Sequence, residues 1–172
     1  MTLSMYQASA PVFRQGLTAL AAILDKLPGQ CAERRIDPAA LLADRLAPDM
    51  YPFTRQVQLT CDTAKGFVSK LTGKEAPVHE DKETTIAELQ QRIQKTIQFL
   101  SSVKAEDFKG WENRQITNPR REGKFLPGNE FALQHAVPNF YFHLTTAYAI
   151  LRHNGLDIGK KDYLGELNYR PL

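Results

Sequence analysis

The chain has few of the residues on which disulfide-rich or membrane proteins depend. Among its 172 residues only Cys31 and Cys61 are cysteines, too few for the disulfide framework of a small secreted domain. The longest early apolar run, residues 17–24, is much shorter than the roughly 20 residues that cross a bilayer. Residues 1–16 lack the basic start and long apolar run of a secretory signal. We therefore expect a cytoplasmic protein with reduced thiols and no membrane contact.

The sequence also lacks the short motifs of the common catalytic sites. It has no His-Glu-x-x-His, Cys-x-x-Cys, Gly-x-Ser-x-Gly or Walker-type sequence, and no Glu-x-x-His pair of a di-iron site. Cys61 follows the apolar face of a predicted helix, so we expect a small core residue there rather than a nucleophile. The motifs therefore leave open whether the protein is an enzyme.

Positive and negative charges are nearly balanced, with 22 basic and 19 acidic residues and a net charge of +3. The content of 42% hydrophobic and 24% charged residues is typical of a soluble globular protein, and the length predicts one domain over residues 1–172. Basic side chains are densest at Arg114, Arg120, Arg121 and Lys124. We expect a solvated loop there; nucleic-acid binding, which needs a clustered basic surface, is the less favoured alternative.

Apolar residues at helical spacing, together with helix-start and helix-stop residues, predict the first long helix. Ser4 starts it through a capping box with Gln7. Pro11 predicts a kink or a late start, because proline removes a backbone donor. Pro28-Gly29 is expected to end this helix, and a short helix over residues 38–46 is expected to follow.

The second and third long helices have clear boundaries in the sequence. The second spans residues 53–71, and Gly73 closes it with the left-handed backbone that glycine adopts readily. The third begins at a capping box formed by Thr85 and Glu88. Glu88 and Arg92 are both expected on its solvated face.

Residues 101–137 lose the helical period and predict a long connection. Within it, residues 115–117 and 124–126 predict a small β-hairpin. A fourth helix is expected to start at or near Pro138 and to end at Asn154-Gly155. Four amphipathic helices with a long connection before the last predict an all-α, antiparallel four-helix bundle.

The fourth helix carries the one histidine that falls on a buried face. A rotation of 100° per residue places four apolar residues at the centre of that face: Phe140, Leu144, Ala147 and Leu151. His143 lies at one edge of this face. Phe142 points the opposite way, which makes it a candidate contact for the long connection or for a second subunit.

Several motifs resemble those of an uncharacterised bacterial family, a domain-of-unknown-function branch of the DinB/YfiT-like superfamily. They are Pro48-Asp49-Met50, Asp81-x-Glu83-Thr84-Thr85, Pro138-x-Phe140-Tyr141-Phe142-His143, Leu151-Arg152-His153-Asn154-Gly155 and Gly159-Lys160-Lys161-Asp162-Tyr163-Leu164-Gly165. The resemblance covers nearly the whole chain. It implies a four-helix bundle with a characteristic crossover, often a homodimer. In many members three histidines hold a divalent metal, and some members transfer small thiols.

The resemblance also implies that the metal site is degenerate in this chain. Metal-binding relatives carry two histidines four residues apart on the last helix, and Asn139 stands at the first of these positions, with His143 at the second. The second helix, which supplies the third histidine in those relatives, contains none.

Two hypotheses for function follow. In the first, a buried His143 is hydrogen-bonded to Gln56, a threonine or a tyrosine, and the bundle binds a small molecule nearby without a cofactor. The residues that are candidates for this pocket are His143, Asn139, Gln56, Thr60, Thr63 and Tyr148. In the second, the protein is a metal-dependent transferase or hydrolase in which His143, with Gln56, Asn139 or water, holds a divalent transition metal.

A second group of metal-binding residue types precedes the third helix. His79, Asp81 and Glu83 could bind a cation together. Acidic residues ahead of a helix start also stabilise the helix dipole, and we favour this structural role.

Overall fold

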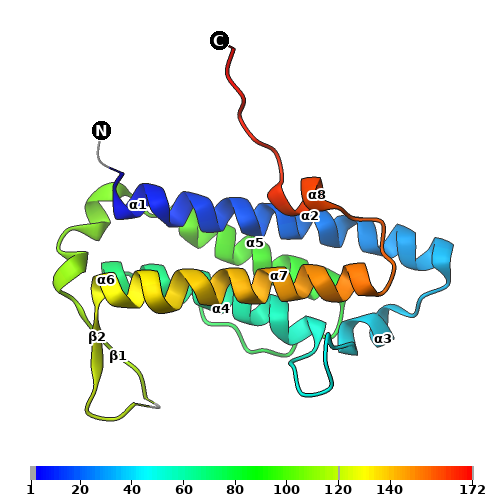
Figure 1. Cartoon of the computed structure of the whole chain (residues 1–172), viewed down its shortest axis with the longest axis horizontal. Helices are drawn as coiled ribbons and strands as arrows, with labels where there is room; N and C mark the ends of the chain where they lie inside the picture. Colours follow the sequence, from blue (N-terminus) through cyan, green and yellow to red (C-terminus); the bar gives the residue numbers. More distant parts are fainter. Residues whose placement is uncertain (1–2, 120, 172) are drawn as a thin grey trace.

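Four long helices form the molecule, in the order expected for the bundle (Figure 1). The computed structural model describes residues 3–119 and 121–171, so Arg120 of the basic stretch lies outside the described residues. The long helices are α2 (Ala10–Arg34), α4 (Phe53–Thr72), α5 (Ile86–Ser101) and α7 (Val137–His153). The shorter helices are α1 (Met5–Ala8), α3 (Pro38–Ala43), α6 (Gly128–Glu130) and α8 (Lys160–Leu164). None of the described helices combines the length and apolarity that a membrane span requires.

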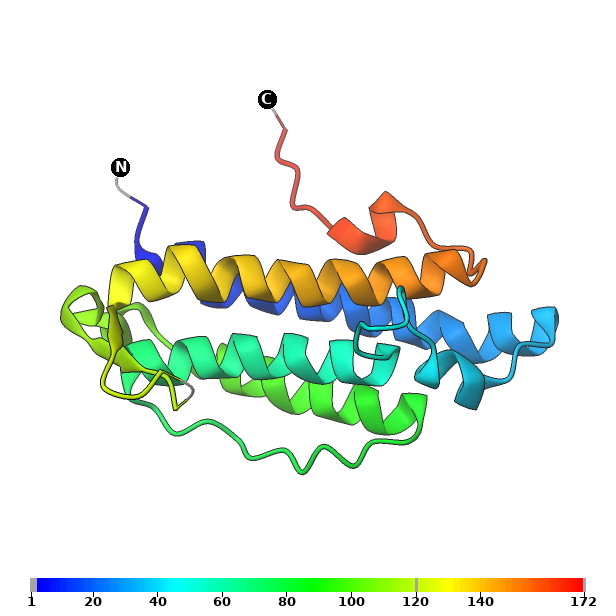
Figure 2. The same ribbon diagram turned by 60° about the horizontal axis from the view of Figure 1, so that its bottom comes forward.

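The chain crosses the length of the bundle between α4 and α5. Residues 73–85 run back beside the helices as an extended strap (Figure 2), so that α4 and α5 point in the same direction. The later connection, described over residues 102–119 and 121–127, stays at one end of the bundle. Consequently α4 is antiparallel to α7, and α2 is antiparallel to α5. The all-α four-helix bundle is confirmed, with its crossover one connection earlier than the sequence suggested.

An aromatic cluster joins three of the long helices toward the hairpin end of the bundle. Phe13 of α2 contacts Phe67 of α4 edge to face, with 5.1 Å between ring centroids, and Phe140 of α7 at 4.5 Å. Phe67 also stacks on Phe131 at 6.3 Å. Because these rings are almost fully buried, they position α7 and the segment before it against α4.

Prolines mark the helix starts more reliably than the helix ends. The Ser4–Gln7 capping box forms, and the helix breaks at Ser9, so that α2 starts late around Pro11 as expected. The predicted end at Pro28-Gly29 is wrong, because α2 continues to Arg34. Pro28 lies on the exposed face, and the apolar positions on either side of it still pack in the core.

The connection before α7 contains the predicted hairpin and an unpredicted stretch of helix. Two 3₁₀ turns, η1 (Ala105–Phe108) and η2 (Trp111–Asn113), precede strands β1 (Gln115–Thr117) and β2 (Phe125–Pro127), which pair antiparallel. Helix α6 then leads through the π-helix η3 (Phe131–Ala136) into α7. Helix α7 itself begins at Val137 with Pro138 in its first turn, as expected, but it continues directly from α6 and η3, which the sequence did not predict.

Gly128 fixes the base of the hairpin against η2. A Cβ at this position would lie only 1.9 Å from the carbonyl oxygen of Trp111. The backbones can approach this closely only at a glycine.

Arg92 is the clearest departure from the sequence analysis. Its side chain is buried on the inner face of α5 rather than solvated. One guanidinium nitrogen contacts Asp81 at 2.7 Å and Glu83 at 2.9 Å, both on the strap, and the other contacts Asp62 of α4 at 2.7 Å. Burial alone would raise the pKa of Glu83, but the hydrogen bonds from Arg92 hold it below its ordinary value. Asp81 and Glu83, which were considered as ligands for a bound cation, therefore bind the guanidinium of Arg92 instead.

His79 lies beside this ion cluster with its side chain 4% exposed. Neither ring nitrogen has a hydrogen-bond partner among the described residues. Burial of the ring, with the nearby charges of Arg92 and Lys65, lowers the pKa of His79 to about 4, although Asp62 and Glu83 oppose the shift. The ring is therefore neutral at neutral pH.

Replacement of Arg92 is expected to destabilise the fold strongly. Arg92→Met leaves three carboxylates without their shared partner, and loss of one member of a buried ion cluster costs about 3–5 kcal/mol. The matched control is Arg55→Met, which removes a partly exposed pair with Asp81 and should cost at most about 1 kcal/mol. The free energies of unfolding from urea denaturation measure both. Equal losses in the two variants would contradict the structural role of Arg92.

The free energy of unfolding should also decrease as the pH is lowered, because of His79. The unfolded chain binds a proton at this histidine near pH 6.5, and the folded chain only near pH 4. Acid therefore favours the unfolded state between these values. His79→Leu should be more stable than the wild type by about 2 kcal/mol at pH 5, with a smaller difference at pH 7. Parallel urea titrations at the two pH values test this, and an identical pH dependence in both proteins would exclude the effect.

Candidate functional site

The seam between α4 and α7 brings together most of the predicted pocket residues. His143 is buried, and its Nδ1 lies 2.8 Å from Oε1 of Gln56. Gln56 Nε2 donates to the carbonyl of Tyr51 at 3.0 Å. This bond assigns the orientation of the amide, so that Oε1 is the acceptor and His143 Nδ1 carries the proton. Burial, with the charge of Arg55, lowers the pKa of His143, which favours the neutral ring.

A second polar pair lies one turn further along the seam. Asn139 Nδ2 donates to Thr63 Oγ1 at 2.8 Å. Thr60 is fully buried, and its hydroxyl donates a hydrogen bond of 2.8 Å to the backbone carbonyl of Gln56 in the same helix. Tyr148, in contrast, packs edge to face on Tyr163 of α8, with 5.6 Å between centroids. Five of the six candidates therefore lie at the seam, four of them in two hydrogen-bonded pairs and Thr60 bonded to its own helix. Tyr148 instead contacts α8.

These residues do not fit the three-histidine metal site of related bundles. The seam offers one imidazole, His143, whose Nε2 is the only ring nitrogen left for a metal because Nδ1 is bonded to Gln56. The remaining groups are neutral amides and hydroxyls, which are weak ligands for transition metals. Within residues 3–119 and 121–171, no three histidine, cysteine or acidic side chains gather closely enough to hold a metal ion.

The thiols are equally unsuited to chemistry. Both Cys31 and Cys61 are buried and free. Burial raises the pKa of the Cys61 thiol to about 12, so that the reactive thiolate is absent at neutral pH.

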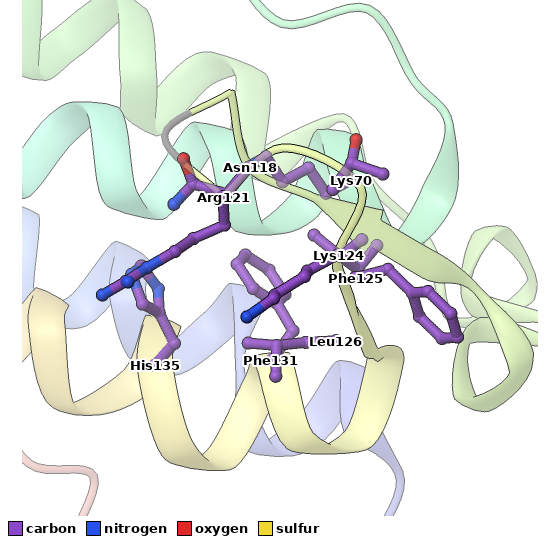
Figure 3. Close-up of a pocket in the computed structure, with 10 residues that line it drawn as sticks. Lys70, Asn118, Arg121, Lys124, Phe125, Leu126, Phe131 and His135 are labelled. Carbon is purple, nitrogen blue, oxygen red and sulfur yellow. The ribbon is translucent and has the colours of Figure 1, made fainter.

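The open space of the seam lies beyond Asn139, at the hairpin end. A cleft of about 190 Å³ lies between α4 and η3, and Thr63, Gly66 and Asn139 are among its lining residues. It adjoins a larger pocket of about 390 Å³ beneath the hairpin (Figure 3). Three residues line both: Lys70, Phe131 and His135. We call the two cavities together the hairpin groove.

The hairpin groove was only partly visible in the sequence. Its hairpin residues come from the basic stretch that was expected to be solvated, including Arg121 and Lys124. Phe131 and His135 were missed because the helix was predicted to start after them. The density of basic residues next to the aromatic Phe125 was the available signal.

The comparisons with known proteins agree with this architecture. A family profile described as a domain of unknown function, DUF1993, matches residues 5–164. The chain is 47% identical to a DinB family member protein from Shewanella denitrificans with a known crystal structure. That match has a TM-score of 0.94 and covers 98% of this chain and 96% of the other. No curated protein matches. The chain therefore belongs to DUF1993, a DinB-like family of unknown function.

Proposed function

We propose that this protein binds a small organic molecule in the hairpin groove. The observation that carries the proposal is the pair of adjoining cavities, about 390 and 190 Å³, which share an aromatic floor at Phe131. Concave sites of this size, lined by apolar residues with a few polar groups, are typical small-molecule sites. The π-helix η3, which carries Phe131 and His135, also supports it, because π-helical turns recur at functional sites.

His143 has a structural part in this proposal. Its hydrogen bond to Gln56 closes the seam two helical turns from His135, so the ligand is placed beyond Asn139 rather than at His143 itself. The pocket expected near His143 is thereby moved toward the hairpin. A homodimer, for which the half-exposed Phe142 on α7 is a candidate contact, and a cytoplasmic location stay predictions from the sequence.

The alternative is a metal-dependent transferase or hydrolase built around His143. The two hypotheses predict different metal contents for the purified protein. Protein purified without chelators should contain no stoichiometric zinc, nickel or iron by elemental analysis, because the seam lacks the ligands for tight binding. A full equivalent of one of these metals that is lost in His143→Ala, but retained in His153→Ala, would support the alternative and contradict the proposal.

Ligand binding can be tested with naphthalene derivatives of different charge. The probes are 2-naphthoate, 2-naphthamide and 2-naphthylmethylamine, titrated into ¹⁵N-labelled protein. We expect saturable, one-to-one shifts at Lys70, Phe131 and His135 for at least one probe. A dissociation constant of about 1 mM or lower is expected, from about 0.3 kcal/mol for each of roughly 13 non-hydrogen atoms.

Two results would contradict the proposal. One is the absence of saturable shifts for all three probes. The other is a set of shifts centred away from the hairpin groove. Gly66→Leu provides a further check, because Gly66 lines the cleft with open space beside its Cα, and a leucine there should weaken probes long enough to enter the cleft.

A further inference from the structure

We propose that the ligand of the hairpin groove is an organic anion with a flat, apolar body, whose anionic group lies under the hairpin and whose body lies on Phe131. This inference rests on the proposed function and adds the chemical class of the ligand.

The larger pocket of the groove has positive charge without nearby acidic groups among its described lining residues. Its charged lining residues are Lys70, Arg121 and Lys124, and no aspartate or glutamate is present among the described lining residues. In the part of the chain that the structure describes, these three cations take part in no ion pair. Basic groups that converge in a concave, partly apolar site without acidic partners attract an anion.

Other basic residues of this chain show the contrast. Arg55, Lys65 and Lys74 pair with carboxylates at 2.6–3.2 Å. Arg92 pairs with three carboxylates. These four basic residues are thus neutralised by carboxylates, whereas Lys70, Arg121 and Lys124 have no such partner among the described residues and converge on one pocket.

The floor of the pocket is the aromatic ring of Phe131. Phe131 is 6% exposed, and its ring stacks with Phe67 at 6.3 Å and with His135 at 5.6 Å. Lys70 Nζ lies 5.1 Å from its centroid. Ile116 and Leu126 add aliphatic walls. A flat ring or a short apolar chain fills such a space by burying apolar area.

The basic side chains of the hairpin point into the pocket. Arg121 and Lys124 extend from the hairpin across the pocket toward His135 and Phe131 on the opposite wall (Figure 3). A guanidinium and an ammonium offer strong, charge-assisted donors to a carboxylate, sulfonate or phosphate. The adjoining cleft contains Asp62, so that the anionic end fits the hairpin side and not the cleft.

The same basic residues do not form a surface for a nucleic-acid backbone. Arg114, the first basic residue of the stretch, donates to the carbonyl of Thr72 at 3.0 Å and packs against Gly73. Arg121 and Lys124 line a pocket rather than a ridge. A small anion therefore fits the geometry better than a polymer does.

The experiment compares matched probes. We expect 2-naphthoate to bind at least about tenfold more tightly than the isosteric neutral 2-naphthamide, because it adds charge-assisted hydrogen bonds, and 2-naphthylmethylamine to bind weakest. Added salt should weaken the binding of 2-naphthoate and leave the affinity for 2-naphthamide nearly unchanged.

A charge-matched pair of variants locates the effect. The variant Arg121→Gln/Lys124→Gln should lose roughly tenfold or more in affinity for 2-naphthoate and little for 2-naphthamide. The control, Lys109→Gln/Lys160→Gln, removes the same net charge at two exposed positions outside the pocket and should leave both affinities unchanged. The ¹⁵N spectra verify that both variants are folded.

The outcomes separate the two proposals. If none of the probes binds, the proposed function fails. If 2-naphthamide binds in the groove as tightly as 2-naphthoate, the groove is a ligand site but the inference of an anion is wrong. If a single-stranded oligonucleotide saturates the hairpin residues while 2-naphthoate does not, the basic stretch binds nucleic acid and the inference is again overturned.

Discussion

The ion cluster around Arg92 is the constraint on which the arrangement of the helices depends. The strap of residues 73–85 carries no regular structure, so its path is fixed by side chains. Arg92 holds Asp81 and Glu83 of the strap and Asp62 of α4 at once. A buried guanidinium requires such partners, and it thereby joins α4, α5 and the strap. The crossover makes α4 and α5 parallel, which leaves the opposite face of α4 to α7.

That face of α4 becomes the wall of the hairpin groove. The aromatic contacts run from Phe13 of α2 through Phe67 of α4 to Phe131 at the pocket floor. Core packing therefore positions the floor, and a buried ring that is already packed loses little freedom when a ligand binds. The hairpin is tied to the same end at Gly128, where Trp111 leaves no room for a side chain. The groove is thus preorganised on its floor, and its charged residues extend from the hairpin above it.

Local signals predicted most of the fold, whereas the site depended on contacts that no local signal encodes. Capping boxes at Ser4 and Thr85 and the left-handed Gly73 appear as expected, since each depends on neighbours within a few residues. Arg92 was misplaced because its partners lie 9 to 30 residues away, and a helical wheel cannot show a charge that the strap covers. The π-helix before Pro138 was missed for a similar reason: tertiary packing of Phe131 stabilises a winding that sequence periodicity does not indicate.

The two polar pairs of the seam explain how a bundle of this family can retain its shape with a single imidazole at the site. Asn139 and Thr63 satisfy each other, as do His143 and Gln56, and a buried polar group with a partner carries no large penalty. Each pair also has one favourable alignment of α7 on α4, because a shift of either helix by one turn would break both hydrogen bonds. The pairs therefore set the register that a shared metal would otherwise impose. Through that register they hold Phe131 and His135, which lie earlier in the same helical segment, in the lining of the groove.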